Sequence, residues 1–483
     1  MKKKKILTYV IIFALTLLLF YNFITMHYAT DTYNIINRGY KEYAIKYSLN
    51  DGRVFMSLIS LFADLINLPI EAYIILLTII ALAVSCISVM KIQSFAEKYY
   101  KNDKKISKYI ILLISYLIIF NFAFLENMQF AECAVMAISI LLDIIAAKAI
   151  VEKEKNYVIK SCLLMLISVF CYQGTVNWFI TITFFFSIIK GENLKDIIKN
   201  VLISGIEIII GIGANLLQVK CTGILLNMTA TRMGSINNIP QNITYILNKL
   251  MYILTETSGI FPKYLFITFT GALLFISLFL LNNQKKAYGI IGIIFIGIGA
   301  SLAPHLITLA AFGTARMYYS IGAIIGLVLL YIFINAKDKK IVYNFIVILI
   351  SIYFVISVYT YASIMYEHKK VNKQDKEEAI AIGKWIEEYE NNSGIEVKYI
   401  VIVINGKSHI FYDYINNKCA LNYRAIYAEW SRIGLLNYYN NRNFEEVVAP
   451  HENYKYYFLD KKWDKLDKEQ LVFSGPILYL YVY

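Results

Sequence analysis

Long apolar runs separated by short lysine-rich loops constrain the fold of this chain more than any other feature. Runs such as 6–25, 68–89 and 341–364 reach or approach the roughly 18 to 20 residues that a helix needs to cross a bilayer. The chain is 58% hydrophobic and 17% charged, whereas a soluble domain is about 25% charged. These features predict an all-α polytopic membrane protein.

The net charge of +13 is explained by the same architecture, because basic residues collect in the cytoplasmic loops of membrane proteins. Lys2 to Lys5 precede the first apolar run, which is therefore expected to run outward. The run could be a signal peptide, but no small-x-small cleavage site follows it, which favours an uncleaved first helix. One assignment of about eleven transmembrane helices then places every short lysine-rich loop inside. No nucleic-acid partner is needed to account for the charge. The lysine-rich loops are 91–108, 153–160, 190–199, 285–286 and 337–340.

Two domains follow from this assignment, a transmembrane domain over 1–365 and a soluble extracytoplasmic α/β domain over 366–483. The first extracytoplasmic loop is 26–53, and the stretch 220–261 is expected to form a long polar loop on the same side. In the second domain, apolar residues at helical spacing predict an amphipathic helix, and a β-branched run predicts a strand. These elements are expected at 375–389 and 397–404, followed by one or two helices within 420–439.

Acidic residues gather at the predicted outer ends of the helices, where charge is costly unless it is paired or used. Asp31 lies just after the first helix, where a carboxylate could act as general base on a hydroxyl group; the alternative is a solvated or capping acid. Asp51 opens another apolar stretch and could equally be a turn residue. Glu126 and Glu132 interrupt an apolar hairpin, where a simple turn would need Gly, Asn or Pro. The candidate catalytic residues are Asp31, Asp51 and Glu126.

Arginines and amides at the same helix ends are candidates for substrate binding. An arginine can hold a phosphate through two parallel hydrogen bonds, although Arg53, Arg232 and Arg316 could also be anchors at the outer membrane face. A backbone break at membrane depth is tolerated where it lines a cavity, but it can also hold packed polar groups. The candidates for substrate binding are Arg53, Gln129, Tyr172, Gln173, Arg232 and Arg316.

The chain contains no HExxH, GxSxG, Walker A or GxGxxG pattern, so the common signatures of soluble catalytic and nucleotide-binding sites are absent. No metal site and no cofactor are expected, although paired acids could hold a divalent cation. No cytosolic domain is predicted that would bind a nucleotide sugar.

The order of several short motifs resembles that of the bacterial GtrII-type glucosyltransferases, which belong to the GT-C group of membrane glycosyltransferases. The resemblance covers roughly residues 20–340. One departure is that the paired acids expected after the first helix are here Asp31 followed by Thr32, which leaves Asp51 and Glu126 as rival candidates for the base. The motifs are Thr30-Asp31-Thr32, Asp51-Gly52-Arg53, LENMQF at 125–130, CYQG at 171–174 and Ala315-Arg316-Met317.

The resemblance implies a GT-C-like fold in the bacterial plasma membrane. The donor would be a polyprenyl-phosphate sugar, such as undecaprenyl-phosphate glucose, and the acceptor a cell-surface polysaccharide on the outer face. A flippase and a polyprenyl-phosphate glucose synthase would be partners, besides membrane lipid itself. Two alternatives stay open: a flippase or transporter for lipid-linked glycans, for which Asp143 and Glu207 are deep acids, and a surface-polysaccharide polymerase.

Overall fold

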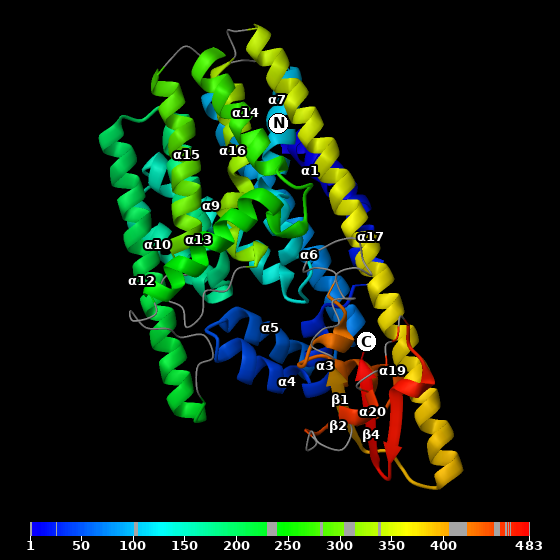
Figure 1. Cartoon of the computed structure of the whole chain (residues 1–483). Coiled ribbons are helices and arrows are strands. Elements are labelled where there is room, and N and C mark those ends of the chain that lie inside the picture. The colour runs from blue at the N-terminus through cyan, green and yellow to red at the C-terminus, as the bar shows by residue number, and fades with distance from the viewer. Residues whose placement is uncertain are drawn as a thin grey trace.

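A computed structural model describes residues 2–25, 27–100, 105–228, 239–280, 284–303, 314–336, 340–404, 423–448, 455–458, 461, 463 and 465–482. In these ranges a large helical bundle carries a small β-sheet at one end (Figure 1). The amino-terminal end of α1 lies at the opposite end of the bundle from the sheet, and the long helix α17 runs along the bundle to reach it.

The first half of the bundle alternates long helices with short helical turns. Its elements are α1 (Lys2–Leu19), α2 (Tyr21–Thr25), α3 (Thr30–Arg38), α4 (Tyr40–Tyr43), the π-helical turn η1 (Ala44–Leu49), α5 (Val54–Leu65), α6 (Ile70–Tyr99), α7 (Lys105–Ile119), α8 (Phe122–Asn127), α9 (Cys133–Glu152), α10 (Tyr157–Cys171) and the 3₁₀ turn η2 (Gln173–Thr175).

The second half ends in the helix that enters the carboxy-terminal region. Its elements are α11 (Asn177–Lys190), α12 (Leu194–Leu226), α13 (Ile239–Glu256), η4 (Thr257–Gly259), α14 (Leu265–Leu280), α15 (Gln284–Leu302), η6 (Ala315–Tyr318), α16 (Tyr319–Asn335) and α17 (Lys340–Ser393).

Within the described residues, five helices are long and apolar enough to cross a membrane, or six if the bent pair at the amino terminus is one span. Several shorter apolar helices lie beside them, including α5, α10 and α14. The protein is therefore a helical membrane protein, as predicted, while the number of eleven spans stays a prediction.

Three segments differ from the expected secondary structure. The loop 26–53 is mostly helical, since it contains α3, α4 and η1. The expected polar loop 220–261 contains α13, whose apolar residues recur at helical spacing around Asn242 and Asn248. The helix expected at 375–389 is the last part of α17, which continues from the bundle for 54 residues.

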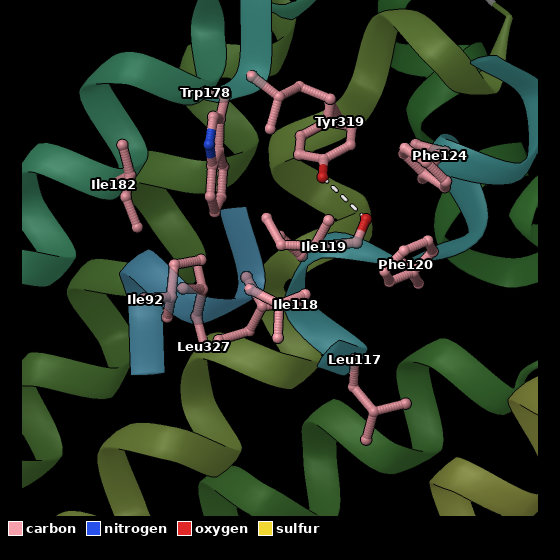
Figure 2. Packing of buried hydrophobic residues seen from close by; sticks show 14 of the residues in the cluster. Ile92, Leu117, Ile118, Ile119, Phe120, Phe124, Trp178, Ile182, Tyr319 and Leu327 are labelled. Atoms are coloured by element: carbon pink, nitrogen blue, oxygen red, sulfur yellow. Dashed lines mark hydrogen bonds between the residues drawn. The ribbon is translucent and has the colours of Figure 1, made fainter. Parts of the chain in front are cut away.

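Helices α7, α11 and α16 pack tightly in the centre of the bundle (Figure 2). Trp178 meets Tyr319 edge to face with ring centroids 5.4 Å apart, and the Tyr319 hydroxyl donates a 2.8 Å hydrogen bond to the Ile119 carbonyl where α7 ends. A Cβ atom on Gly326 would lie 3.0 Å from the Ile118 nitrogen, so glycine allows the two helices to approach. This packing fixes the carboxy-terminal end of α7, after which α8 begins.

The carboxy-terminal region is built on a four-stranded sheet of order β2-β1-β4-β3. The strand β1 pairs in parallel with β2 and β4, and β3 pairs antiparallel with β4. Apolar residues of α17 and α19 pack in one cluster with this sheet. The strand β1 confirms the strand expected at 397–404. The elements are β1 (Tyr399–Ile404), η8 (Ala425–Tyr427), α19 (Arg432–Asn440), β2 (Glu445–Glu446), α20 (Lys455–Phe458), η9 (Lys468–Gln470), β3 (Leu471–Ser474) and β4 (Ile477–Val482).

Candidate active site

A buried ion pair between Glu126 and Arg316 forms the centre of the candidate site. The Arg316 Nη1 atom donates to Glu126 Oε1 at 2.8 Å, and its backbone N–H donates to Glu126 Oε2 at 2.7 Å. The two side chains are only 12% and 4% exposed. The Asn121 side chain caps α8 by accepting from the backbone of Ala123 and Phe124, which sets the direction of the helix that carries Glu126.

Tyr172 joins this ion pair to a second arginine. Its hydroxyl accepts a 3.1 Å hydrogen bond from Arg316 Nε, and the Arg53 guanidinium lies 5.6 Å from the centre of its ring. The Arg316 guanidinium also lies 4.1 Å from the centre of the Phe130 ring. Two arginines from distant parts of the chain are thus gathered around one tyrosine at the break between α10 and η2.

The turn that carries Arg53 is anchored by amide side chains. Gln173 Nε2 donates to the Asp51 carbonyl and to Asn215 Oδ1, both at 3.1 Å, and Asn215 Nδ2 donates to the Gly52 carbonyl at 2.7 Å. Arg53 Nη2 lies 3.9 Å from the Asp51 carboxylate. Gln173 therefore holds the turn through its backbone, a role that the side-chain pattern alone does not reveal.

Two further carboxyl groups lie beside Arg53 and Arg316. Asp31 is half-buried in the first turn of α3 and is within electrostatic reach of Arg316 and Glu132. Glu132 is buried at the start of α9, where the Tyr43 hydroxyl donates a hydrogen bond to it. Burial raises the pKa of the Glu132 carboxyl, and the nearby charge of Asp31 raises it further.

The structure thus brings together most of the candidates that the sequence suggests, from five separate segments. Gln129 is buried in the turn after α8, and its carbonyl oxygen accepts a hydrogen bond from His27. Arg232 lies outside the described residues. The gathered candidates are Asp31, Asp51, Arg53, Glu126, Tyr172, Gln173 and Arg316.

Three residues of the site escape selection from the sequence. Asn215 stands in an apolar helix, so its polarity at membrane depth is the signal that could have found it. Lys249 of α13 lies within electrostatic reach of Glu126. It was not selected because it falls in the stretch 220–261, which was expected to be a polar loop. Tyr43 is one of 40 tyrosines and has no distinguishing sequence context.

No group of three or more His, Cys, Asp or Glu side chains that could hold a metal ion occurs among the residues that the structure describes. The carboxyl groups of the site are instead set against arginines and tyrosine hydroxyls, an arrangement suited to binding an anion and moving a proton.

A family model described as Glucosyl transferase GtrII matches residues 20–333, well over half of the chain. The chain belongs to the GtrII glucosyltransferase family. No curated protein matches it. The part matched as GtrII includes every gathered site residue and ends within α16, before α17 and the carboxy-terminal sheet. This GtrII protein is therefore a glycosyltransferase built on membrane helices, with its candidate site at the end of the bundle that faces the sheet.

Proposed function

We propose that this protein transfers a glucosyl group from a polyprenyl-phosphate donor, such as undecaprenyl-phosphate glucose, to a cell-surface polysaccharide. The observation that carries this proposal is the pair of arginines around Tyr172, whose side chains are only 16% (Arg53) and 12% (Arg316) exposed. Arg53 Nε is buried and has no hydrogen-bond partner among the described residues. A buried donor without a partner is costly, and the phosphate of a lipid-linked sugar would supply the missing acceptor.

The arrangement of charge suits a phosphate leaving group. Charge grows on the phosphate as its bond to the sugar breaks, and pre-oriented donors that meet this charge lower the barrier. Glu126 accepts hydrogen bonds through both carboxylate oxygens and fixes the orientation of Arg316. We therefore assign Glu126 to holding the phosphate-binding arginine, and the removal of the acceptor proton to a carboxyl group near Asp31. The reaction needs no nucleotide and no cofactor.

The proposed site is on the outer face of the bacterial plasma membrane. The lysines at the start of α1 support a cytoplasmic amino terminus, and the site and the sheet lie at the other end of the bundle (Figure 1). A synthase must then form the polyprenyl-phosphate sugar and a flippase must carry it outward. The sheet would also be extracytoplasmic.

The deep acids do not favour the transporter alternative. Asp143 accepts a 2.6 Å hydrogen bond from Ser168, and Glu207 accepts one of 2.6 Å from Ser161. They lie in separate side-chain networks, whereas transporter sites gather such groups near the membrane midplane.

A membrane assay with radiolabelled polyprenyl-phosphate glucose and the host's surface glycan tests the proposal. Wild-type membranes should transfer label to the glycan, and the Asp31→Asn, Glu126→Gln and Arg316→Ala variants should each transfer much less. Normal transfer by all three variants would contradict the site, and no transfer by the wild type would contradict the function.

A further inference from the structure

We propose that Glu132 is the general base of the transfer, with Asp31 as its partner carboxylate. This inference rests on the proposed function and settles which acid takes the proton of the acceptor hydroxyl. It also supplies the second acid that the sequence lacks beside Asp31, because Glu132 comes from a segment 101 positions further along the chain.

The hydrogen bond from Tyr43 leaves one oxygen of the buried Glu132 carboxyl unused. Glu132 occupies the position before the first turn of α9, but its side chain does not cap that helix. The side chain is 2% exposed, and its Oε1 atom has no hydrogen-bond partner among the described residues. A buried carboxyl oxygen without a partner is costly and points to a ligand that is absent here.

Two other acids of the site, Glu126 and Asp51, already face arginines, and Asp31 is only half-buried. Both oxygens of Glu126 accept hydrogen bonds from Arg316, and Asp51 faces Arg53 from the same turn. A general base needs an oxygen that is free to accept the proton of the reacting hydroxyl, and Glu132 Oε1 has no hydrogen-bond partner among the described residues.

The surroundings of Glu132 favour a carboxyl group that takes up a proton more readily than an exposed one. The groups that face it are Asp31 from α3, Tyr43 from α4, Arg53 before α5 and Tyr73 from α6. Burial and the Asp31 charge raise the pKa of Glu132, while the Tyr43 hydrogen bond and the Arg53 charge oppose the rise. A raised pKa brings the carboxyl closer to the working pH, where general-base catalysis is most efficient.

In the glucosyl transfer, the acceptor oxygen forms a bond to the anomeric carbon of the glucosyl group. The bond from that carbon to the phosphate oxygen breaks, and its electron pair stays on the phosphate. The hydroxyl proton passes to Glu132 Oε1. Arg53 is within electrostatic reach of Glu132. The proton acceptor, Glu132, and the phosphate-binding group, Arg53, would therefore both lie next to the reacting atoms.

The first test compares Glu132→Gln with Glu207→Gln in purified protein, using the labelled lipid donor. Glu207 is an equally buried acid outside the site, so it controls for the loss of a buried carboxyl group. Glu132→Gln should lower kcat by about 10²- to 10⁴-fold with little change in the KM of the donor, while Glu207→Gln keeps its rate. A folded Glu132→Gln protein with a wild-type kcat would overturn the inference without touching the proposed function, provided that Asp31→Asn and Arg316→Ala are still impaired.

The second test is the pH profile of kcat/KM, which a merely structural role would not move. Activity should fall as the pH drops through the pKa of Glu132, because only the ionised carboxylate accepts the proton. Asp31→Asn removes the charge that raises this pKa, so the acidic limb of its residual activity should move to lower pH. An acidic limb that stays where it is in the wild type would overturn the assignment of Glu132. If the wild type did not use the lipid donor, the proposed function itself would be contradicted.

Discussion

Single side chains at the site are held by contacts that only one residue type can make. Arg316 reaches Glu126 through Nη1, Tyr172 through Nε and the Phe130 ring through the face of its guanidinium. A buried arginine would be costly without such partners. Lysine offers a single charged nitrogen on a flexible stem and cannot replace the planar fork.

Arg316→Lys should therefore lower kcat/KM for the lipid donor by about 10²-fold, although the charge is kept. Arg38→Lys is the matched control, because Arg38 is exposed and pairs with Glu42 of the next helix, α4. Initial rates of labelled transfer at several donor concentrations measure the effect. Equal kcat/KM values for the two variants would show that Arg316 supplies charge alone.

At the scale of elements, the turn before α5 is fitted to α12 and η2. Gly52 has a positive φ of 80°, and a Cβ atom there would lie 2.6 Å from both polar atoms of the Asn215 amide. Gly39 has nearly the same φ of 79° but no atom within 4 Å of the corresponding position. The two glycines thus have nearly the same φ, and only Gly52 is in close contact with a neighbouring side chain.

Gly39→Ala should cost about 1–3 kcal/mol of stability from the backbone alone, because its φ of 79° and ψ of 159° are almost confined to glycine. Gly52→Ala should cost more and should also lower transfer, because the displaced Asn215 no longer holds the turn that carries Arg53. Thermal unfolding in detergent and the transfer rate measure the two effects. Equal losses of stability and activity in both variants would mean that the docking of this turn does not matter.

The break between α10 and η2 rests on a second polar network inside the bundle. The Ser139 hydroxyl lies 2.8 Å from Ser168 and 2.7 Å from Thr175, and Ser168 donates to Asp143. Thr175 donates to the Tyr172 carbonyl at 3.3 Å. The network thus supports the backbone of the tyrosine that holds both arginines.

Ser139→Ala should raise the KM of the donor several-fold, since Tyr172 loses part of its support. Ser115→Ala is a suitable comparison, because the Ser115 hydroxyl donates only to the carbonyl of Ile111 in its own helix and its removal should leave the KM unchanged. Steady-state kinetics of both variants measure this. A wild-type KM for Ser139→Ala would show that the break is rigid without the network.

The sequence grouped the candidate residues better than it placed the elements that carry them. Alternation of apolar runs and lysines puts Asp31, Glu126 and Arg316 at the same end of the bundle, and the structure brings them together. The pairing of Glu126 with Arg316, 190 positions apart, depends on how helices pack, which periodicity does not encode. Gln173 was selected as a candidate for substrate binding, but its bond to the Asp51 carbonyl was not predicted, because a backbone acceptor leaves no trace in side-chain types.

The same limit explains the differences in secondary structure. The composition changes near residue 366, but no proline lies between 340 and 393, so α17 continues where the chain leaves the apolar environment. The change in composition marks a change in the surroundings of α17, not the end of the helix. In α13, the amides between the apolar residues masked the helical spacing.

At the scale of the whole molecule, the carboxy-terminal region supports the helix that carries Asp31. Asn372 of α17 exchanges hydrogen bonds of 2.7 and 2.9 Å with the backbone of Tyr28, and the Tyr33 and Tyr439 hydroxyls lie 3.2 Å apart. A Cβ atom on Gly434 of α19 would collide with the Tyr33 carbonyl. The region outside the GtrII match thus touches the candidate site through α3.

Gly434→Ala should push α3 away from α19 and lower transfer through the displacement of Asp31. Gly205→Ala serves as its control, because a Cβ atom at that position in α12 has nothing within 4 Å. The expected result is a clear loss of kcat in the first variant and none in the second, measured on protein that elutes as folded. A fully active Gly434→Ala protein would show that the site does not depend on the carboxy-terminal region.

The most direct test of the account as a whole is a comparison of donors with the purified protein in proteoliposomes. Radiolabelled glucose is offered either as polyprenyl-phosphate glucose or as the nucleotide sugar, with the surface glycan outside the vesicles. We predict transfer from the lipid donor only, reduced by about 10²-fold or more in Arg316→Ala. Equal transfer from the nucleotide sugar, or lipid-dependent transfer that is unaffected in Arg316→Ala, would contradict it.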